Sequence, residues 1–409
     1  MRFQIQRLRR RVLSATALCG VGLVSLGGLG PAAAAADIRS KQWYLQDMQA
    51  DNMWKVSKGE GVTVAVIDSG VDAQLPELGG QVLAGADFTK SPAGAHKDSN
   101  GHGTNMAALI AGTGKEGGIQ GLAPEAKILP VKVTVNQKTE IVDQMLAKAM
   151  RYAVDHDARV INVSLAPVGP PSYFTKFKAA VDYAMGKGSL VVAGVGNSGD
   201  KENLPAYPSS FPGVLGIGAM DRRGEVTKWS NHGDQVGLVA FGDELPEHCT
   251  KSEGICMAGG TSQATAITSA SAALIRSKHP EWSPNQVLRV MMETAGKPAK
   301  AKLPSKYLGY GSIRPRKVLV DGEGNPGPAD VNPLLAANQK STASGSPTPA
   351  PSSGKSTEGG QGETKTDSAA SAESKSSSTG GNTVLWTVVG VAAVVLLGGL
   401  AVFMRRRAR

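Results

Sequence analysis

The sequence predicts an α/β domain built on a mainly parallel sheet, together with one helix that crosses a membrane near the C-terminus. Two observations predict the domain: short β-branched apolar runs alternate with helical runs, and the connections between them are short. That alternation is typical of a parallel sheet with helices on both faces. A third observation predicts the membrane helix, since residues 384–404 are mostly Val, Leu, Ala and Gly and carry no charge.

The first 36 residues have the layout of a secretory signal peptide. A basic region ends at Arg11, an apolar stretch follows, and an alanine run ending at Ala36 offers cleavage sites. An uncleaved N-terminal anchor is the alternative interpretation. Under either interpretation, we expect the domain that follows to lie outside the cytoplasm.

The net charge of +10 comes almost entirely from the two ends of the chain. Residues 1–36 contain five arginines and residues 405–409 contain four, with no acidic residue in either segment, which leaves 10 − 9 = +1 for the rest. The basic ends therefore indicate membrane topology, and we expect no nucleic-acid partner.

Residues 37–320 are expected to form the folded domain. A short extension with Trp43, Tyr44 and Trp54 comes first, and its aromatic side chains are expected to clamp it onto the domain. The β-branched composition predicts strands at 61–67, 127–133, 160–165, 190–195 and 214–219. Apolar periodicity predicts helices at 100–111, 140–155, 173–185 and 262–278.

The region after the domain changes composition. Residues 321–383 are rich in Gly, Ser, Thr, Pro and Ala and are expected to be a disordered linker. The transmembrane helix at 384–404 follows, and the basic tail at 405–409 is expected to be cytoplasmic. The predicted location is therefore the cell membrane, with a single span and an extracellular domain.

Three motifs place polar side chains where an α/β domain gathers its functional groups. Asp68 ends the first strand, His102 begins a helix between two glycines, and Ser262 begins an apolar helix. Each motif alone is ordinary turn or capping chemistry. A serine nucleophile, however, needs a base and an orienting acid, and the three residues supply them in the chain order Asp, His, Ser.

The chain resembles the subtilisin-like serine proteases (subtilases) from about Lys41 to Val320. The resemblance rests on Val64-Ala65-Val66-Ile67-Asp68-Ser69-Gly70-Val71-Asp72, Asn100-Gly101-His102-Gly103-Thr104 and Gly260-Thr261-Ser262-Gln263-Ala264-Thr265. It implies a three-layer subtilisin-like fold, in which a mainly parallel sheet lies between helices. It also implies a serine endopeptidase that cleaves protein or peptide substrates.

Carried over residue by residue, the resemblance gives each site residue a role. Asp68 orients the imidazole, His102 is the general base and then the general acid, and Ser262 is the nucleophile. Asn197 matches the family's oxyanion asparagine. The activity is expected to fall as His102 becomes protonated, near or below about pH 7.

Ser164, Leu165 and Ala166 match the family's substrate-binding strand. The family usually has glycine at the position of Ala166, so its methyl group is expected to narrow the cleft. The helix after the nucleophile also departs from the family pattern at two positions. Gln263 replaces the usual methionine, and Ala266 replaces the usual proline. Phe241 replaces another usual proline, with no evident consequence.

Cys249 and Cys256 are expected to form a disulfide, because the domain is predicted to be exported. Two unpaired thiols are the alternative. The histidine and cysteine spacings match no common metal site, and no nucleotide motif is present, so neither a metal nor another cofactor is expected. Asp98 and Asp72 are expected to support the histidine and aspartate loops.

The order of segments resembles the mycosins, membrane-anchored subtilases associated with type VII secretion. The signal peptide and the catalytic domain are close together, so we expect no separately folded inhibitory segment. The resemblance implies processing of proteins exported by a type VII secretion complex. Two alternatives remain open: a mainly structural component that stabilises a secretion complex, or a general cell-surface protease.

Overall fold

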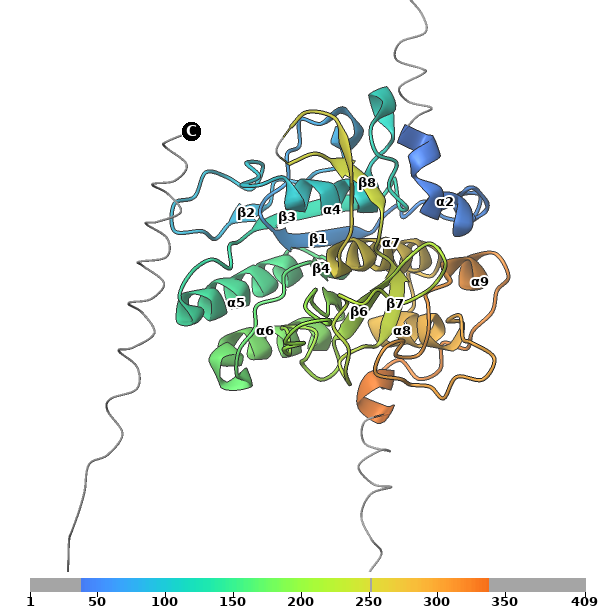
Figure 1. Cartoon of the computed structure of the whole chain (residues 1–409). Coiled ribbons are helices and arrows are strands. Elements are labelled where there is room, and N and C mark those ends of the chain that lie inside the picture. The colour runs from blue at the N-terminus through green and yellow to red at the C-terminus, as the bar shows by residue number, and fades with distance from the viewer. Residues whose placement is uncertain (1–37, 251, 338–409) are drawn as a thin grey trace, which may run out of the picture. The chain divides into compact units, whose positions relative to one another are not determined.

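A computed structural model describes residues 38–250 and 252–337 (Figure 1). Seven strands form one sheet in the order β2-β3-β1-β4-β5-β6-β7, and every neighbouring pair is parallel. The strands are β1 Thr63–Asp68, β2 Ala86–Asp87, β3 Lys127–Lys132, β4 Val160–Val163, β5 Leu190–Gly194, β6 Leu215–Met220 and β7 Leu238–Phe241. A separate antiparallel hairpin pairs β8 Leu245–His248 with β9 Ile255–Ala258.

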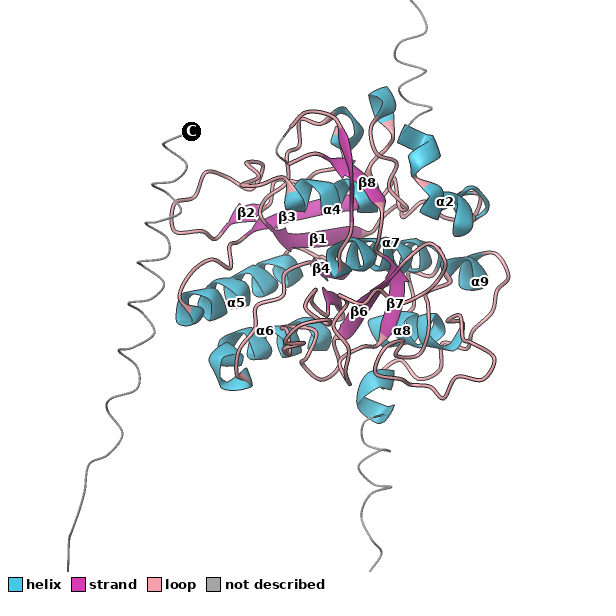
Figure 2. Cartoon of the chain, viewed as in Figure 1, coloured by secondary structure: helices cyan, strands magenta, loops and turns pink. Residues whose placement is uncertain are grey.

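Helices cover both faces of this sheet (Figure 2). The α-helices are α2 Trp43–Asp47, α3 Ala50–Trp54, α4 His102–Ala111, α5 Thr139–Asp155, α6 Thr175–Gly186, α7 Thr261–Lys278, α8 Pro284–Glu293 and α9 Pro315–Leu319. Three short 3-10 turns lie at Pro76–Leu78, Lys115–Gly117 and Pro171–Phe174. The three-layer subtilisin-like arrangement predicted from the sequence is therefore present.

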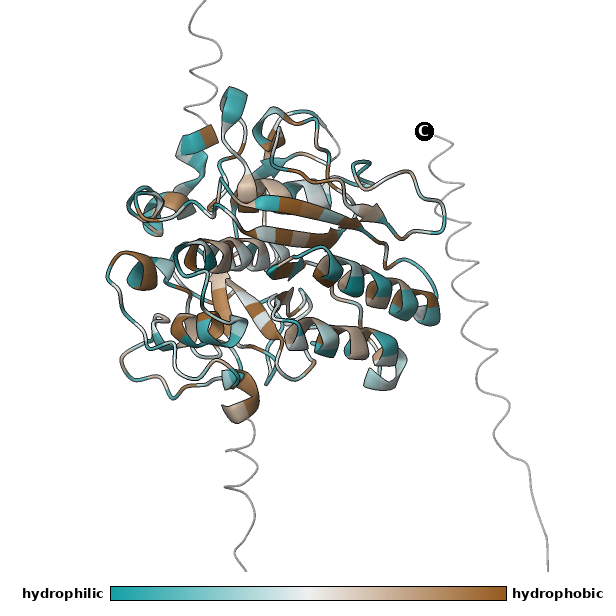
Figure 3. Cartoon of the chain, turned by 180° about the vertical axis from the view of Figure 1, so that it is seen from behind, coloured by the Kyte–Doolittle hydropathy of each residue, from teal (hydrophilic) through white to brown (hydrophobic). Residues whose placement is uncertain are grey.

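Alternate residues of β1 enter two separate hydrophobic cores. Val64 and Val66 pack with α4, α7 and α8, whereas Ala65 and Ile67 pack with α5 and α6. A strand that is buried on both faces needs a continuous apolar run, which is the pattern of residues 64–67. The strands in the middle of the molecule are accordingly mostly brown in the hydropathy view (Figure 3).

Pro130 lies inside β3 although proline has no N–H to donate to a neighbouring strand. Ile128 and Lys132, two residues before and after Pro130, hydrogen-bond to the segment that contains β2. Because alternate residues of a strand direct their N–H groups to the same edge, the N–H that Pro130 lacks would also face that segment. β2 spans only Ala86–Asp87, which leaves the chain beside Pro130 unpaired. Gly85 passes at this point with φ +68°, and a Cβ there would lie 2.1 Å from the Pro130 carbonyl oxygen.

The N-terminal extension packs onto the domain through its aromatic side chains, as the sequence predicts. Tyr44 is fully buried, and the Trp54 indole donates to the Leu122 carbonyl at 2.8 Å. The Trp43 indole donates to the Glu244 carbonyl at 3.0 Å. The extension is therefore tied both to the chain before β3 and to the chain between β7 and β8.

The folded region extends beyond the predicted boundary at residue 320. Arg289 donates to the carbonyls of Pro326 and Val331, and Asn332 donates to the carbonyl of Gly213. Residues 321–337 therefore pack against the domain, and the predicted start of the linker at 321 is too early. The composition of this segment resembles that of a linker, but α8 and the residue 213 loop supply its hydrogen-bond partners.

Three of the predicted segments lie outside the described residues: the signal peptide at 1–36, the helix at 384–404 and the tail at 405–409. Most of the predicted linker also lies outside them. Between residues 38 and 337, excluding 251, no helix has the length and apolar character needed to span a bilayer.

Candidate active site

A cleft of about 570 Å³ lies at the carboxyl edge of the sheet. All the residues predicted to act as triad, oxyanion donor or substrate strand line this one cleft: Asp68, His102, Ser164, Leu165, Ala166, Asn197 and Ser262. They come from the ends of β1, β4 and β5 and from the starts of α4 and α7. The edge at which parallel strands end therefore gathers residues that are far apart in the sequence.

Asp68 holds the imidazole of His102. The ring Nδ1 lies 2.7 Å from Asp68 Oδ1, which also accepts the Ser69 N–H at 2.8 Å. The other oxygen, Oδ2, is buried and has no hydrogen-bond partner among the described residues. Gly103 permits this contact, because a Cβ there would lie 2.2 Å from the Gly70 carbonyl oxygen and 3.0 Å from Asp68 Cβ.

Asp98 organises the turn that carries His102. Its carboxylate accepts the Thr104 N–H and hydroxyl at 2.8 Å and 2.5 Å, and the N–H groups of Asn100 and Gly101. It also accepts the Ser69 hydroxyl at 2.7 Å, which links it to the turn after Asp68. Burial raises the pKa of Asp98, but these hydrogen bonds outweigh burial and hold the pKa below its ordinary value.

The titration of His102 differs from the sequence-based expectation. Burial lowers its pKa, but the charge of Asp68 and the hydrogen bond to it outweigh burial and raise the pKa from 6.5 to about 9. Since a general base must be neutral, the expected loss of activity on protonation moves from near pH 7 to a higher pH.

Ser262 lies in the first turn of α7, a helix buried on nearly all sides. Its hydroxyl donates to the Ser164 carbonyl at 3.2 Å, and the Ser164 hydroxyl donates to the Ser262 carbonyl at 3.2 Å. In the part of the chain that the structure describes, no hydrogen bond joins Ser262 to His102. A rotation about the Ser262 Cα–Cβ bond changes the partner of the hydroxyl, and such bonds often form only in the substrate complex.

Asn197 lies on the loop after β5, beside the start of α7. Its Oδ1 accepts the Thr261 N–H at 2.9 Å, which fixes the amide and leaves Nδ2 to donate toward the cleft. The first N–H groups of a helix have no partner within the helix and carry partial positive charge. The Asn197 amide and the Ser262 N–H can together stabilise an oxyanion at this position.

The strand segment 164–166 forms one wall of the cleft. Ser164 is buried, Leu165 is half-buried and the methyl group of Ala166 is exposed. Asn162 donates to the Ser164 hydroxyl at 3.0 Å and accepts the Ser269 hydroxyl at 3.0 Å. These buried bonds join β4 to α7 and so fix the wall relative to Ser262.

The β8–β9 hairpin lies just before the nucleophile and contains the Cys249–Cys256 disulfide that the sequence predicts. Asn105 of α4 bonds through its amide to both the N–H and the carbonyl of His248. Glu247 accepts a hydrogen bond from Gln263 of α7. Glu247 is not among the residues predicted from the sequence, because a single acidic residue in a short strand has no periodic or motif signal.

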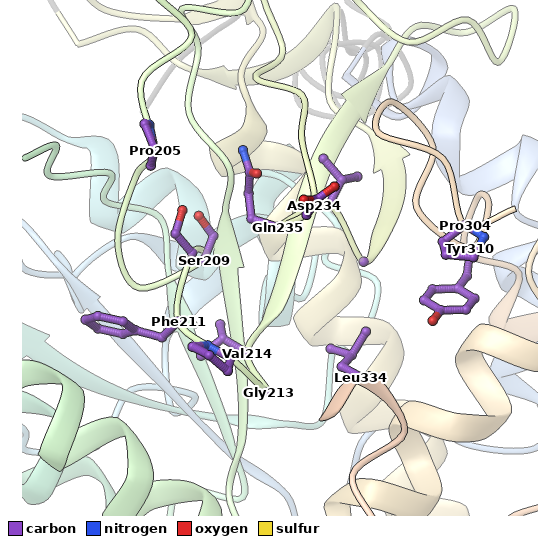
Figure 4. A pocket seen from close by; sticks show the side chains of 14 residues that line it. Pro205, Ser209, Phe211, Gly213, Val214, Asp234, Gln235, Pro304, Tyr310 and Leu334 are labelled. Atoms are coloured by element: carbon purple, nitrogen blue, oxygen red, sulfur yellow. The ribbon is translucent and has the colours of Figure 1, made fainter. Parts of the chain in front are cut away.

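A second pocket, of about 330 Å³, lies elsewhere in the domain (Figure 4). Ser209, Gln235 and Tyr310 are among the residues that line it, and none of the predicted site residues is. Within 38–250 and 252–337, no group of three His, Cys, Asp or Glu side chains could hold a metal ion. Of these two pockets, the cleft at Asp68 is the one that both His102 and Ser262 line.

The chain is similar to known proteases over most of the described region. Residues 59–311 match the Subtilase family, Peptidase_S8. The major intracellular serine protease of Bacillus subtilis (strain 168) is 34% identical over 252 residues, which cover 60% of this chain and 78% of that protein. Thermitase of Thermoactinomyces vulgaris is 33% identical over 240 residues, which cover 58% and 83%.

Solved structures of mycosins also match. MycP1 from Mycobacterium smegmatis matches with a TM-score of 0.63 and 26% identity, covering 71% of this chain and 86% of that chain. The MycP3 protease from the type VII (ESX-3) secretion system matches with a TM-score of 0.59 and 30% identity, covering 68% and 87%. The chain therefore belongs to the subtilase family and is a subtilisin-type serine endopeptidase related to the mycosins.

Proposed function

We propose that Asp68, His102 and Ser262 form the catalytic triad of a membrane-anchored extracellular endopeptidase. The observation that carries this proposal is the 2.7 Å contact between His102 Nδ1 and Asp68 in a cleft that Ser262 and Asn197 also line. Asp68 holds the ring through Nδ1, which leaves Nε2 to take the proton of the Ser262 hydroxyl.

The proposed reaction has two stages. Ser262 Oγ attacks the carbonyl carbon of the scissile peptide while His102 takes its proton, and the oxyanion is stabilised by Asn197 Nδ2 and the Ser262 N–H. The His102 proton then passes to the leaving amine as the peptide C–N bond breaks. Water deprotonated by His102 finally attacks the acyl-enzyme, and the proton passes from His102 to Ser262 Oγ as the ester C–O bond breaks and the acid product leaves. The segment 164–166 is proposed to pair with the substrate backbone.

We test the nucleophile with a fluorophosphonate probe applied to membranes from cells that produce the full-length chain. Labelling should occur in the wild type, should map to Ser262 by mass spectrometry and should be lost in Ser262→Ala. Equal labelling of the wild type and Ser262→Ala would show that the nucleophile assignment is wrong.

The proposed setting is the outer face of the cell membrane, with exported proteins of a type VII secretion system as substrates. The similarity to MycP1 and MycP3 supports the secretion role, and the apolar sequence of residues 384–404 supports the anchor. A chain truncated after residue 383 should leave the membrane fraction. A Ser262→Ala strain should fail to process an exported substrate. Full processing in that strain would contradict the proteolytic role and favour a structural role for this protein.

A further inference from the structure

Glu247 is a buried carboxyl group near the candidate triad that the proposed mechanism does not use. It lies on β8 with only 6% of its surface exposed, and its Oε1 accepts a hydrogen bond from Gln263 Nε2 at 2.6 Å. Gln263 is 4% exposed and directly follows Ser262 in α7. A buried carboxyl group needs a partner to offset its loss of hydration, and Gln263 is that partner.

The far end of the Gln263 side chain lies over the glycine turn before the nucleophile. A Cβ at Gly260 would lie 2.7 Å from Gln263 Oε1 and 3.2 Å from Asn197 Nδ2. The side chain therefore folds back between the glycine turn and the hairpin, close to the amide proposed to bind the oxyanion. Methionine, usual in the family at this position, has no N–H and could not make the bond to Glu247.

The strand that carries Glu247 is also fixed to the helix that carries His102. Asn105 of α4 bonds to the backbone of His248 at 2.9 Å and 3.0 Å, and the His248 ring pairs with Glu77. β8 is thus held by α4 on one side and, through Glu247 and Gln263, by the first turn of α7 on the other. β8 therefore links the helix that carries His102 to the helix that carries Ser262.

The charges facing Glu247 come from three elements: His102 of α4, Asp68 of β1 and His248 of its own strand. Burial raises the pKa of Glu247, and the hydrogen bond from Gln263 opposes burial only in part. The negative charge of Glu247 in turn contributes to raising the pKa of His102. Replacing Glu247 with a neutral residue should therefore lower the pKa of His102.

We propose that Glu247 is a positioning residue of the protease site, which holds Gln263 and so fixes the turn that presents Ser262 and its N–H. This inference rests on the proposed function of Ser262. Glutamine at position 247 keeps the acceptor for Gln263, whereas leucine keeps the volume and removes the acceptor. Methionine at position 263 removes the donor from the other side.

The test measures the rate of fluorophosphonate labelling of the full-length chain in membranes, across pH, for Glu247→Gln, Glu247→Leu, Gln263→Met and the double variant Glu247→Leu/Gln263→Met. Glu253→Gln, at the exposed tip of the same hairpin, is the control for loss of a charge. Thermal melts identify variants that do not fold. If Glu247→Leu does not fold, Gln263→Met and Glu247→Gln decide the outcome.

We expect the plateau labelling rate to fall about tenfold or more in Glu247→Leu and in Gln263→Met, because small displacements of a nucleophile are costly. The double variant should be no slower than the slower single variant, since the two residues act as one unit. Glu247→Gln should keep the plateau rate within about threefold and shift the midpoint of its pH profile downward. Glu253→Gln should match the wild type in both.

Two sets of results separate the possible failures. If Ser262-dependent labelling is absent in the wild type, the proposed function and this inference fail together. If the wild type labels normally and both Glu247→Leu and Gln263→Met match its rate, only the role of Glu247 is overturned. A multiplicative loss in the double variant would also overturn it, because the residues would then act independently.

Discussion

The indole of Trp43 lies edge-on against the ring of Phe241, with the ring centroids 4.8 Å apart. Phe241 ends β7, and the chain continues from it to the hairpin and the nucleophile helix. The replacement of the usual family proline by Phe241 therefore has a structural consequence: it provides a ring against which Trp43 of the N-terminal extension packs.

Trp43→Ala should lower the free energy of unfolding by about 3 kcal/mol, because the residue is 7% exposed and its ring and hydrogen-bond contacts are lost together. Urea denaturation of the purified protein measures this change. Trp43→Phe retains a ring against Phe241 and should recover more than half of the loss. A Trp43→Ala protein as stable as the wild type would show that the contacts of Trp43 contribute nothing to stability.

The pH dependence of activity should follow the raised pKa of His102. Since its pKa is about 9 and the neutral form is the base, labelling of Ser262 should be half-maximal near pH 9 and should level off only above that pH. Rates measured from about pH 6 to about pH 10 test this profile. A plateau already reached below pH 7 would contradict the raised pKa.

The same shift affects stability in the opposite direction. Because the folded-state pKa of His102 lies above the ordinary value of 6.5, the charged ring stabilises the fold fully below pH 6.5. That contribution is lost as the pH rises through about 9. His102→Ala should therefore show a weaker loss of stability over this range than the wild type, as measured by urea denaturation.

Asn197→Asp tests the oxyanion donor with little change of shape. Aspartate keeps an oxygen for the Thr261 N–H, but it has no amide to donate and its charge repels the oxyanion, so at least about 2.7–4 kcal/mol of transition-state stabilisation should be lost. The reduction in kcat for a peptide substrate measures it. Ser198→Ala, at the next residue, is the control, and an Asn197→Asp enzyme with wild-type kcat would rule out this role.

Asp98→Ala should weaken both stability and labelling. It leaves buried N–H and hydroxyl groups around the His102 turn without an acceptor, which should cost about 1–3 kcal/mol in unfolding free energy near neutral pH. Because the folded-state pKa of Asp98 lies below its ordinary value, this stabilisation is lost as the pH falls through that lower pKa.

Asp72→Asn is the matched control for Asp98, since the Asp72 carboxylate accepts the Gln74 N–H in a neighbouring turn. Its unfolding free energy should stay close to that of the wild type near neutral pH. If Asp72→Asn were as destabilising as Asp98→Ala, the special role of Asp98 in the His102 turn would be refuted.

The sequence by itself determined the fold class and predicted the residues of the site. The runs 64–67 and 190–194 are continuous and apolar, and 160–163 is interrupted only by Asn162, which predicts buried parallel strands whose following residues meet at one edge. The motifs around Asp68, His102 and Ser262 are local, and their chain order restricted the family. The disulfide could be predicted because the domain contains two cysteines and is expected to be exported.

Only the tertiary structure decided how these residues are held. Three sets of hydrogen bonds join positions far apart in the sequence: Glu247–Gln263 over 16 residues, Asn105–His248 over 143 and Trp43–Glu244 over 201. No local sequence pattern predicts them. The pKa of His102 depends on burial and on nearby carboxylates, which exist only in the folded chain. The packing of residues 321–337 onto the domain was equally hidden, because the hydrogen-bond partners of this segment lie elsewhere in the fold.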